Sequence, residues 1–211
     1  PPGSGKTTAV HRLAEMKKKK LAVVVAEAGL RKRDVIGSAE MRDATSFYQA
    51  AEFASAARNG DWALIEELSF ADADALGFLL GMLDRPVVGG STFNIAGMSV
   101  DVHPDFRCFI TRNPGMAGTK KVNEALLDRV VTFPVPPLLD NDLNTMLKAH
   151  DVPANFREQG VAVVDALYKA WEKNHIMYQI SPRRVLQASQ LAKHTKTTNV
   201  TEFRVLLESS I

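Results

Sequence analysis

The sequence predicts an α/β fold in which a parallel sheet flanked by helices is followed by a small all-α domain. Three observations support this prediction. Apolar strand patterns alternate with helical patterns through the first two thirds of the chain. A glycine-rich turn directly precedes the first helical pattern, and no convincing strand follows residue 137. We therefore expect an α/β core over residues 1–137 and a helical domain over residues 138–211, joined by the proline-rich segment Pro134–Pro137.

The predicted core elements follow one another in the order that a parallel sheet requires. A helix is predicted from Lys6 to about Lys19, and the run LAVVVA (21–26) is typical of a buried strand. An Ala-rich helix is predicted over residues 44–58, closed by Asn59-Gly60, and a short strand over residues 61–68 ends in two glutamates. Further elements are a helix at 72–84, a β-hairpin at 87–102, a strand at 106–111, a helix at 122–129 and a last strand at 130–135.

The helical domain and the overall composition narrow the classes of protein to consider. Four helices are predicted at residues 140–149, 155–173, 182–196 and 200–209. The 211 residues carry 26 Lys and Arg against 24 Asp and Glu, so the net charge of +2 predicts neither a nucleic-acid nor a membrane partner. The single cysteine, Cys108, cannot form an internal disulfide, which fits a reducing, cytoplasmic setting. The longest apolar run is far too short to span a bilayer.

The first residues, PPGSGKTT, match the end of a phosphate-binding loop, G-x-x-x-x-G-K-[ST]. Glycines let backbone N–H groups turn toward a phosphate, a lysine adds positive charge, and the following helix presents its positive end. The alternative is an ordinary Gly/Ser turn before a helix. We expect the following residues to contact a nucleotide: Pro2, Gly3, Ser4, Gly5, Lys6, Thr7 and Thr8.

The position of this motif at the start of the sequence leads to a further expectation. The opening glycine of the pattern would lie one position before Pro1, and a buried strand normally leads into it. We therefore expect the sequence to be an N-terminally truncated fragment whose core lacks its first strand. Residues 1–211 expressed alone are then expected to be unstable or to aggregate, because the sheet lacks a central member.

Five elements in this order resemble AAA+ ATPases. They are the phosphate loop, the strand LIEEL, the strand FRCFITRNPG, the helix NEALLDRV and the late SPRRV. More narrowly, DVIG (34–37) and HPDFRCFITRNPG (103–115) resemble the MoxR branch, with its relatives among the cobaltochelatase small subunit and the dynein and midasin modules. The resemblance covers essentially the whole chain. It implies a P-loop NTPase sheet followed by a helical lid.

The resemblance assigns a role to each acidic and amide side chain near the phosphate loop. Glu67 matches the water-activating glutamate of the Walker B strand, and Glu66 stands where an Asp is usual. Glu66 and Thr7 would hold Mg²⁺, and the extra methylene of Glu66 makes the rate of hydrolysis uncertain. Asn113 matches the sensor 1 position. Without the resemblance, the glutamates would be a solvent-exposed turn and Asn113 a turn residue before proline.

Two arginines complete the implied site. Arg129, at the end of a predicted helix, matches the arginine that reaches the ATP of a neighbouring subunit; the alternative is a surface arginine paired with Asp128. Arg183 matches the sensor 2 arginine of the lid, with Ser181-Pro182 as the helix start and Arg184 as the competing candidate. The hairpin at 87–102 matches either a pore-facing insertion or an edge hairpin of the sheet.

The implied function is ATP hydrolysis with Mg²⁺, driving the remodelling or maturation of a partner protein. A trans arginine has meaning only in an oligomer, so the resemblance implies a homo-oligomeric ring, a hexamer. It also implies a client protein, for which a protein with a von Willebrand type A domain is a candidate. One alternative is a nucleotide-dependent oligomeric scaffold with little turnover, which the Glu66 substitution favours. Another is a nucleic-acid-handling motor, for which the run Lys17–Lys20 is the candidate surface unless it is a solvated helix end.

Overall fold

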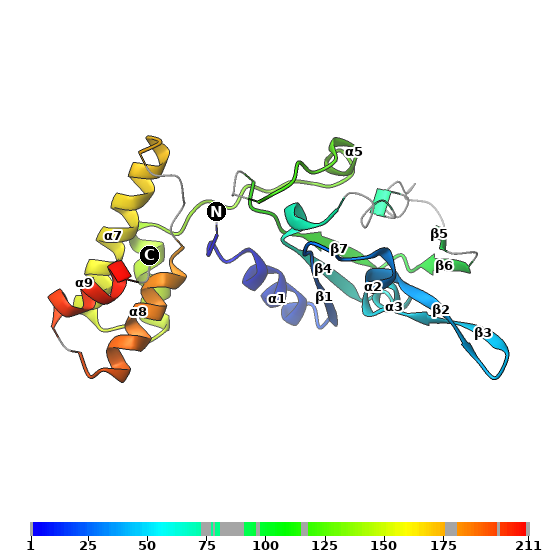
Figure 1. Cartoon of the computed structure of the whole chain (residues 1–211), viewed down its shortest axis with the longest axis horizontal. Coiled ribbons are helices and arrows are strands. Elements are labelled where there is room, and N and C mark those ends of the chain that lie inside the picture. Colours follow the sequence, from blue (N-terminus) through cyan, green and yellow to red (C-terminus); the bar gives the residue numbers. More distant parts are fainter. Residues whose placement is uncertain are drawn as a thin grey trace. The chain divides into compact units, whose positions relative to one another are not determined.

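A computed structural model describes residues 2–72, 77, 79–80, 91–95, 98–114, 118–175, 181–197 and 199–209 (Figure 1). The chain divides into two compact units. One unit comprises Lys6–Phe133, and the other comprises Pro134–Ile211 together with Pro1–Gly5. The assignment of residues 1–137 and 138–211 to separate domains stays a prediction.

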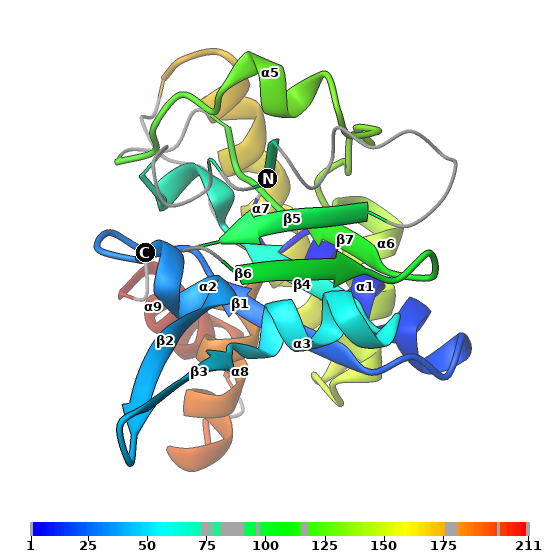
Figure 2. The ribbon, with the colours of Figure 1, turned by 90° about the vertical axis from the view of Figure 1, so that its right-hand side faces the viewer.

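The first unit is built on a parallel sheet with the strand order β1-β4-β7. The strands are β1 (Leu21–Val25), β4 (Trp62–Glu66) and β7 (Arg107–Ile110) (Figure 2). In the central strand β4, Trp62 to Ile65 are buried, as the apolar run predicts for a strand covered on both faces. The helices α1 (Lys6–Met16) and α3 (Glu52–Asn59) pack against the sheet. The predicted parallel sheet flanked by helices is therefore confirmed.

Helix α3 supplies much of the core of this unit. Phe53, Ala54 and Ala57 are fully buried, and the Phe53 ring meets the Phe106 ring edge-on with centroids 5.7 Å apart. The helix ends at Gly60, whose φ of 75° is left-handed and whose N–H donates to the Ala56 carbonyl. The predicted Asn59-Gly60 helix end is confirmed, because glycine adopts this conformation without a Cβ penalty.

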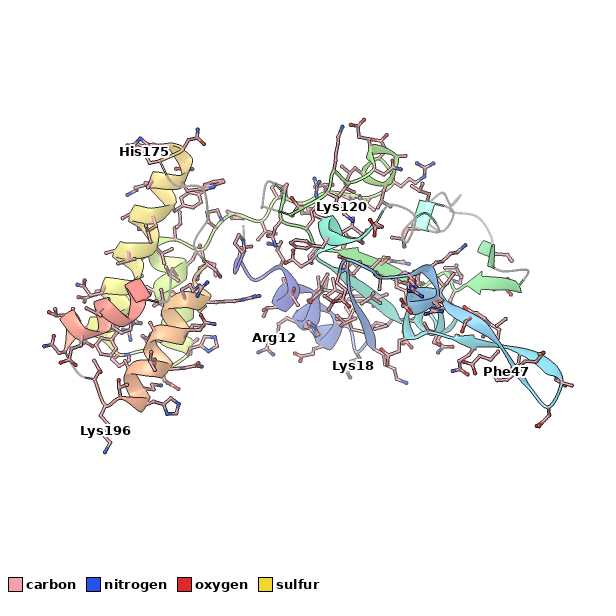
Figure 3. All side chains as sticks on the ribbon, in the orientation of Figure 1. Arg12, Lys18, Phe47, Lys120, His175 and Lys196 are labelled. Carbon is pink, nitrogen blue, oxygen red and sulfur yellow. The ribbon has the colours of Figure 1, made fainter. Side chains whose placement is uncertain are left out.

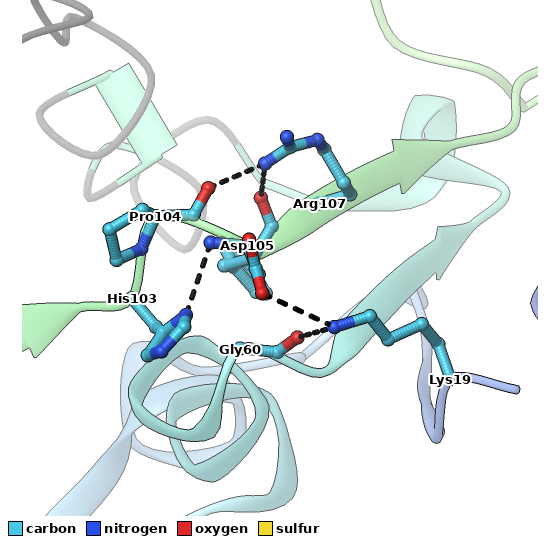
Figure 4. Close-up of polar contacts among 7 residues, drawn as sticks. Lys19, Gly60, His103, Pro104, Asp105 and Arg107 are labelled. Carbon is cyan, nitrogen blue, oxygen red and sulfur yellow. Dashed lines mark hydrogen bonds and ion pairs between the residues drawn. The ribbon is translucent and has the colours of Figure 1, made fainter. Parts of the chain in front are cut away.

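A small polar cluster fixes the segment that follows α3 to the loop before β7 (Figure 4). The Asp105 N–H donates to His103 Nδ1 at 3.1 Å, and the His103 N–H donates to the Ala57 carbonyl at 2.8 Å. Lys19 Nζ donates to the Gly60 carbonyl at 3.0 Å and lies 3.7 Å from Asp105 Oδ2. His103 therefore serves the fold.

The single helix predicted over residues 44–58 is wrong in its first half. After the short helix α2 (Lys32–Ile36), strands β2 (Gly37–Arg42) and β3 (Thr45–Ala50) form an antiparallel hairpin that extends away from the sheet (Figures 1 and 2). Its turn places Asp43 and Ala44 at φ values of 51° and 58°. Thr45, Phe47 and Tyr48 favour a strand, and here the cross-strand partner outweighs the helix propensity of the neighbouring alanines.

The last predicted strand, residues 130–135, is also wrong. The segment has no regular structure and pairs with none of the three described strands. Val131 and Phe133 are 80% and 78% exposed, so their alternation faces solvent. Alternating apolar residues form a strand only when a neighbour accepts their hydrogen bonds, and Pro134 has no N–H to donate.

The remaining elements of the first unit agree with the predicted order. Strands β5 (Ser91–Ile95) and β6 (Met98–Val102) form the predicted hairpin; residues 87–90 and 96–97 of that prediction lie outside the described residues. The 3₁₀ turn η1 (Leu68–Phe70) follows β4, and α5 (Glu124–Leu127) begins at Asn123, whose side chain accepts the Ala125 N–H. Most of the helix predicted at 72–84 lies outside the described residues, although Gly77, Leu79 and Leu80 are helical.

The second unit contains four helices in the described part of residues 138–211, as predicted. They are α6 (Asp140–Ala149), α7 (Ala154–Glu172), α8 (Arg183–His194) and α9 (Val200–Ser209). Their core centres on Phe156 and Phe203, whose rings stack with centroids 4.2 Å apart. Helix α7 contacts α8 closely, since a Cβ at Gly160 would lie against Val185. None of the described helices has the length and apolar character needed to cross a bilayer.

We expect Gly60→Ala to lower the free energy of unfolding by about 2 kcal/mol, which urea denaturation followed by circular dichroism would measure. An alanine there must keep a left-handed φ, and its Cβ would overlap the His103 ring, 2.9 Å from Cε1. The matched control is Gly77→Ala, because Gly77 is helical with open space around it. This control is expected to be neutral or slightly stabilising. Equal effects of the two changes would contradict the role of Gly60.

Candidate functional site

The residues before α1 have the backbone conformation of an anion-binding turn. Gly3 and Gly5 have φ values of 71° and 81°, a region that glycine enters without a steric penalty. Helix α1 then begins at Lys6, and its first turn contains no acidic residue. Ser4 is buried, Thr7 is half-buried and Thr8 is exposed. The turn and the helix start therefore have the local geometry and charge that a phosphate group requires.

Three of the predicted site residues are joined by hydrogen bonds. Lys6 Nζ donates to Asn113 Oδ1 at 2.7 Å. The Asn113 Nδ2 group donates to both carboxylate oxygens of Glu67, at 2.7 and 2.9 Å. Asn113 is only 4% exposed. The amide therefore lies between a cation and an anion, with its oxygen toward the first and its nitrogen toward the second, which strengthens both bonds.

The parallel sheet brings these side chains to the same edge. Glu67 directly follows β4, and Asn113 lies three residues beyond the end of β7, the neighbouring parallel strand. The ladder continues past the paired residues, since the Thr111 N–H donates to the Ile65 carbonyl at 2.9 Å. Because parallel strands end at the same edge, two residues distant in sequence meet there.

Thr111 is a further site residue that the sequence analysis did not single out. Its hydroxyl accepts the Glu67 N–H at 3.3 Å, and its carbonyl accepts the Leu68 N–H at 3.0 Å. Glu67 has a φ of 55°, an uncommon left-handed conformation for a residue with a side chain. Thr111 is 7% exposed, so a polar residue immediately after a buried strand was the available signal. We infer that Thr111 positions the Glu67 backbone.

The two predicted metal ligands, Thr7 and Glu66, belong to different elements. Glu66 is the last residue of β4, opposite Val25 in the β1–β4 register, and its carbonyl accepts the Ala26 N–H at 2.8 Å. Thr7 lies in the first turn of α1. In the described residues, no group of three or more His, Cys, Asp or Glu side chains is arranged to hold a metal ion. Thr7 and Glu66 are thus the oxygen donors that the sequence motif offers for a cation.

The predicted trans arginine lies just after α5. Arg129 Nη1 donates to the Ala125 carbonyl, one helical turn earlier, at 2.6 Å. Arg129 is half-buried and is not part of the apolar core of its unit. Its side chain is therefore held along its own helix and is not enclosed by core residues.

The two candidate lid arginines both begin α8 in the second unit. The Arg183 N–H donates to Ser181 Oγ at 3.3 Å, and the Arg184 N–H donates to the Ser181 carbonyl at 3.0 Å. The predicted role of Ser181 at the helix start is thus supported by its side chain. Arg183 and Arg184 are both exposed, so burial does not distinguish between them.

The basic run Lys17–Lys20 follows α1, and one of its lysines makes polar contacts within the protein. Lys19 Nζ is held by the Gly60 carbonyl and Asp105 (Figure 4). Lys18 is exposed, and Arg12 forms an exposed ion pair with Glu15 at 3.0 Å; Figure 3 shows the side chains of Arg12 and Lys18 at the surface of their unit. Lys19 therefore makes contacts within its own unit. This weakens the argument that the four lysines together form a nucleic-acid-binding surface.

Comparison with known proteins gives a family and a fold. The model of the AAA domain, dynein-related subfamily, matches residues 1–130. A crystal structure described as that of a "putative ATPase" from Cytophaga hutchinsonii is similar with a TM-score of 0.51 and 17% sequence identity. The match covers 92% of this chain and 67% of that chain. At this identity the structural similarity establishes the fold, a P-loop sheet followed by helices.

We expect Thr111→Val to lower the free energy of unfolding by about 1 kcal/mol, because the Glu67 N–H loses its acceptor with little change in side-chain volume. Chemical denaturation would measure the change. Thr92→Val is the matched control, since the Thr92 hydroxyl donates to Asp101 at an exposed position. If both substitutions have the same small effect, Thr111 does not hold the Glu67 backbone.

Proposed function

Because the chain belongs to the dynein-related subfamily of AAA domains, we propose that it binds and hydrolyses ATP and uses the energy to remodel a partner protein. The observation that carries this proposal is the hydrogen-bonded array Lys6–Asn113–Glu67. It combines a cation at the phosphate loop, a buried amide and a carboxylate in direct contact. These are the groups that phosphoryl transfer to water requires: charge neutralisation, positioning and polarisation of the nucleophile.

In this proposal each member of the array has one task. Lys6 binds the outer phosphates, and Glu67 accepts a hydrogen bond from the attacking water and polarises it. Asn113 orients that water relative to the phosphate, because its amide already lies between the cation and the carboxylate. Thr111 keeps the Glu67 backbone in its left-handed conformation. Arg183 or Arg184 at the start of α8 contacts the γ-phosphate.

The residues present fit a triphosphate with a divalent cation. Gly3 and Gly5 have the positive φ values of a phosphate-binding turn, and no carboxylate in the first turn of α1 repels an anion. The Thr7 hydroxyl and the Glu66 carboxylate would hold Mg²⁺. When bound, this ion supplies neutralisation of the charge that develops on the phosphates.

The proposal extends to an oligomer and a client. Arg129 follows α5 and is not part of the apolar core, and in this proposal its guanidinium contacts the phosphates bound by a neighbouring subunit. A ring of identical chains, a hexamer, would bring such arginines to every nucleotide. Rotation of the helical unit on hydrolysis would then act on the client protein.

The first test is Glu67→Gln, for which we expect kcat for ATP hydrolysis to fall by about 100-fold or more with ATP affinity nearly unchanged. The amide keeps the size of the side chain and removes the base. Phosphate release and binding of a fluorescent ATP analogue would be measured on the same preparations. Glu15→Gln is the matched control, because Glu15 is exposed and forms an ion pair with the exposed Arg12 of the same helix.

The Glu67→Gln result also distinguishes ATP hydrolysis from the alternative function, a nucleotide-dependent scaffold. The glutamate at position 66 favours that alternative. Rings that assemble with ATP but show no turnover dependent on Glu67 would support a nucleotide-dependent scaffold. Glu66→Asp restores the shorter carboxylate and is expected to raise kcat if the extra methylene limits the metal position.

The second test concerns Arg129. We expect Arg129→Ala to lower kcat by about 10³-fold, because a cation in trans stabilises the charge of the transition state. Mixing inactive Arg129→Ala with inactive Glu67→Gln chains should restore part of the activity, since mixed rings contain sites with both an intact Glu67 and an intact Arg129. No recovery in mixed oligomers, confirmed by co-purification of two tags, would show that Arg129 does not act across the subunit boundary.

A further inference from the structure

The start of α8 lies directly against the phosphate loop within one compact unit. Gly3, Ser181 and Pro182 all belong to the unit formed by Pro1–Gly5 and Pro134–Ile211. A Cβ at Gly3 would overlap Ser181 Oγ and lie 3.0 Å from Pro182 Cδ. By contrast, a Cβ at Gly5 would meet nothing within 4 Å. The two loop glycines share a left-handed φ, but only Gly3 is in close contact with another segment.

The groups that face Gly3 cannot easily move away. Ser181 Oγ accepts the Arg183 N–H at 3.3 Å, and the Ser181 carbonyl accepts the Arg184 N–H at 3.0 Å, so its side chain and backbone both hold the first turn of α8. Pro182 is buried and its ring restricts φ, here −51°. Val185, one turn later, is fully buried in the helical core. The surface against Gly3 is therefore rigid.

We propose that Ser181 is a positioning residue for the phosphate loop: its side chain, fixed at the start of α8, supports the loop at Gly3 in the conformation that accepts phosphate. The inference rests on the function proposed above and extends it. It means that the loop and the helix carrying Arg183 are coupled by direct packing, in addition to any contact that an arginine makes with the nucleotide. A hydroxymethyl group suits the position, because it is small enough to face the glycine and polar enough to cap the helix.

A double-mutant cycle tests this coupling, with Gly3→Ala and Ser181→Gly measured singly and together. Glycine is an acceptable cap, so Ser181→Gly removes the obstacle while retaining α8. We expect Gly3→Ala to weaken binding of a fluorescent ATP analogue strongly in the wild-type background. The loss should be roughly tenfold smaller in the Ser181→Gly background, within the coupling found for residues in contact. Thermal unfolding without nucleotide should show coupling of the same sign.

Gly5→Ala is the matched control, because it introduces the same left-handed strain in the same loop without a contact. Its effect on ATP affinity should be equal in the two backgrounds. A second control replaces Ser181→Gly by Ser189→Ala, which removes another hydroxyl of α8. The Ser189 hydroxyl donates to the Val185 carbonyl at 2.7 Å. Its removal should leave the effect of Gly3→Ala on ATP affinity unchanged.

The results separate this inference from the proposed function. If the wild-type chain binds ATP and the loss caused by Gly3→Ala is the same in both backgrounds, the inference is overturned and the proposed function stands. If Gly5→Ala shows the same coupling as Gly3→Ala, the effect is not local to the contact and the inference is likewise overturned. A wild-type protein that binds no ATP overturns both.

Discussion

The Asn113 amide connects the two charges on which the site depends. A buried side-chain amide must have partners at both ends, and here the partners are the Lys6 ammonium and the Glu67 carboxylate. The amide can satisfy both only if the first residue of α1 and the end of β4 stay within a few ångströms of the end of β7. The hydrogen bonds of the Asn113 amide therefore require the start of α1 and the ends of β4 and β7 to lie close to one another.

The sheet provides that convergence. Strands β4 and β7 run parallel and in direct contact, so residues that follow them leave the same edge, and Thr111 extends the ladder by one more hydrogen bond to the Ile65 carbonyl. The hydroxyl of the same threonine accepts the N–H of Glu67, whose backbone is left-handed. Phe53 and Ile65 are fully buried in the apolar core of the same unit.

The phosphate loop has a second constraint, which comes from the helical unit. Gly3 lies against Ser181 and Pro182, whereas Lys6 begins the helix that packs on the sheet. Membership in the dynein-related AAA subfamily gives this arrangement a context, because such domains are nucleotide-dependent.

Local patterns in the sequence predicted most of the regular elements and the types of residue at the candidate site. Glycines at 3, 5 and 60, the apolar runs that form β1, β4 and β7, and the helices of the second unit all depend on neighbours close in sequence. The hairpin β2–β3 was missed, because its alternating Thr, Phe and Tyr residues lie among alanines and gain stability only from a partner strand.

The sequence by itself therefore determined the glycine-rich turn before α1, the parallel sheet and the candidates Lys6, Glu67 and Asn113. Only the tertiary structure decided that Asn113 bridges the other two, that Thr111 fixes Glu67, that Ser181 meets Gly3 and that residues 130–135 form no strand. Each of these features requires a partner far away in the chain. Periodicity and propensity describe what one segment can do, whereas the choice of partner is set by packing of the whole unit.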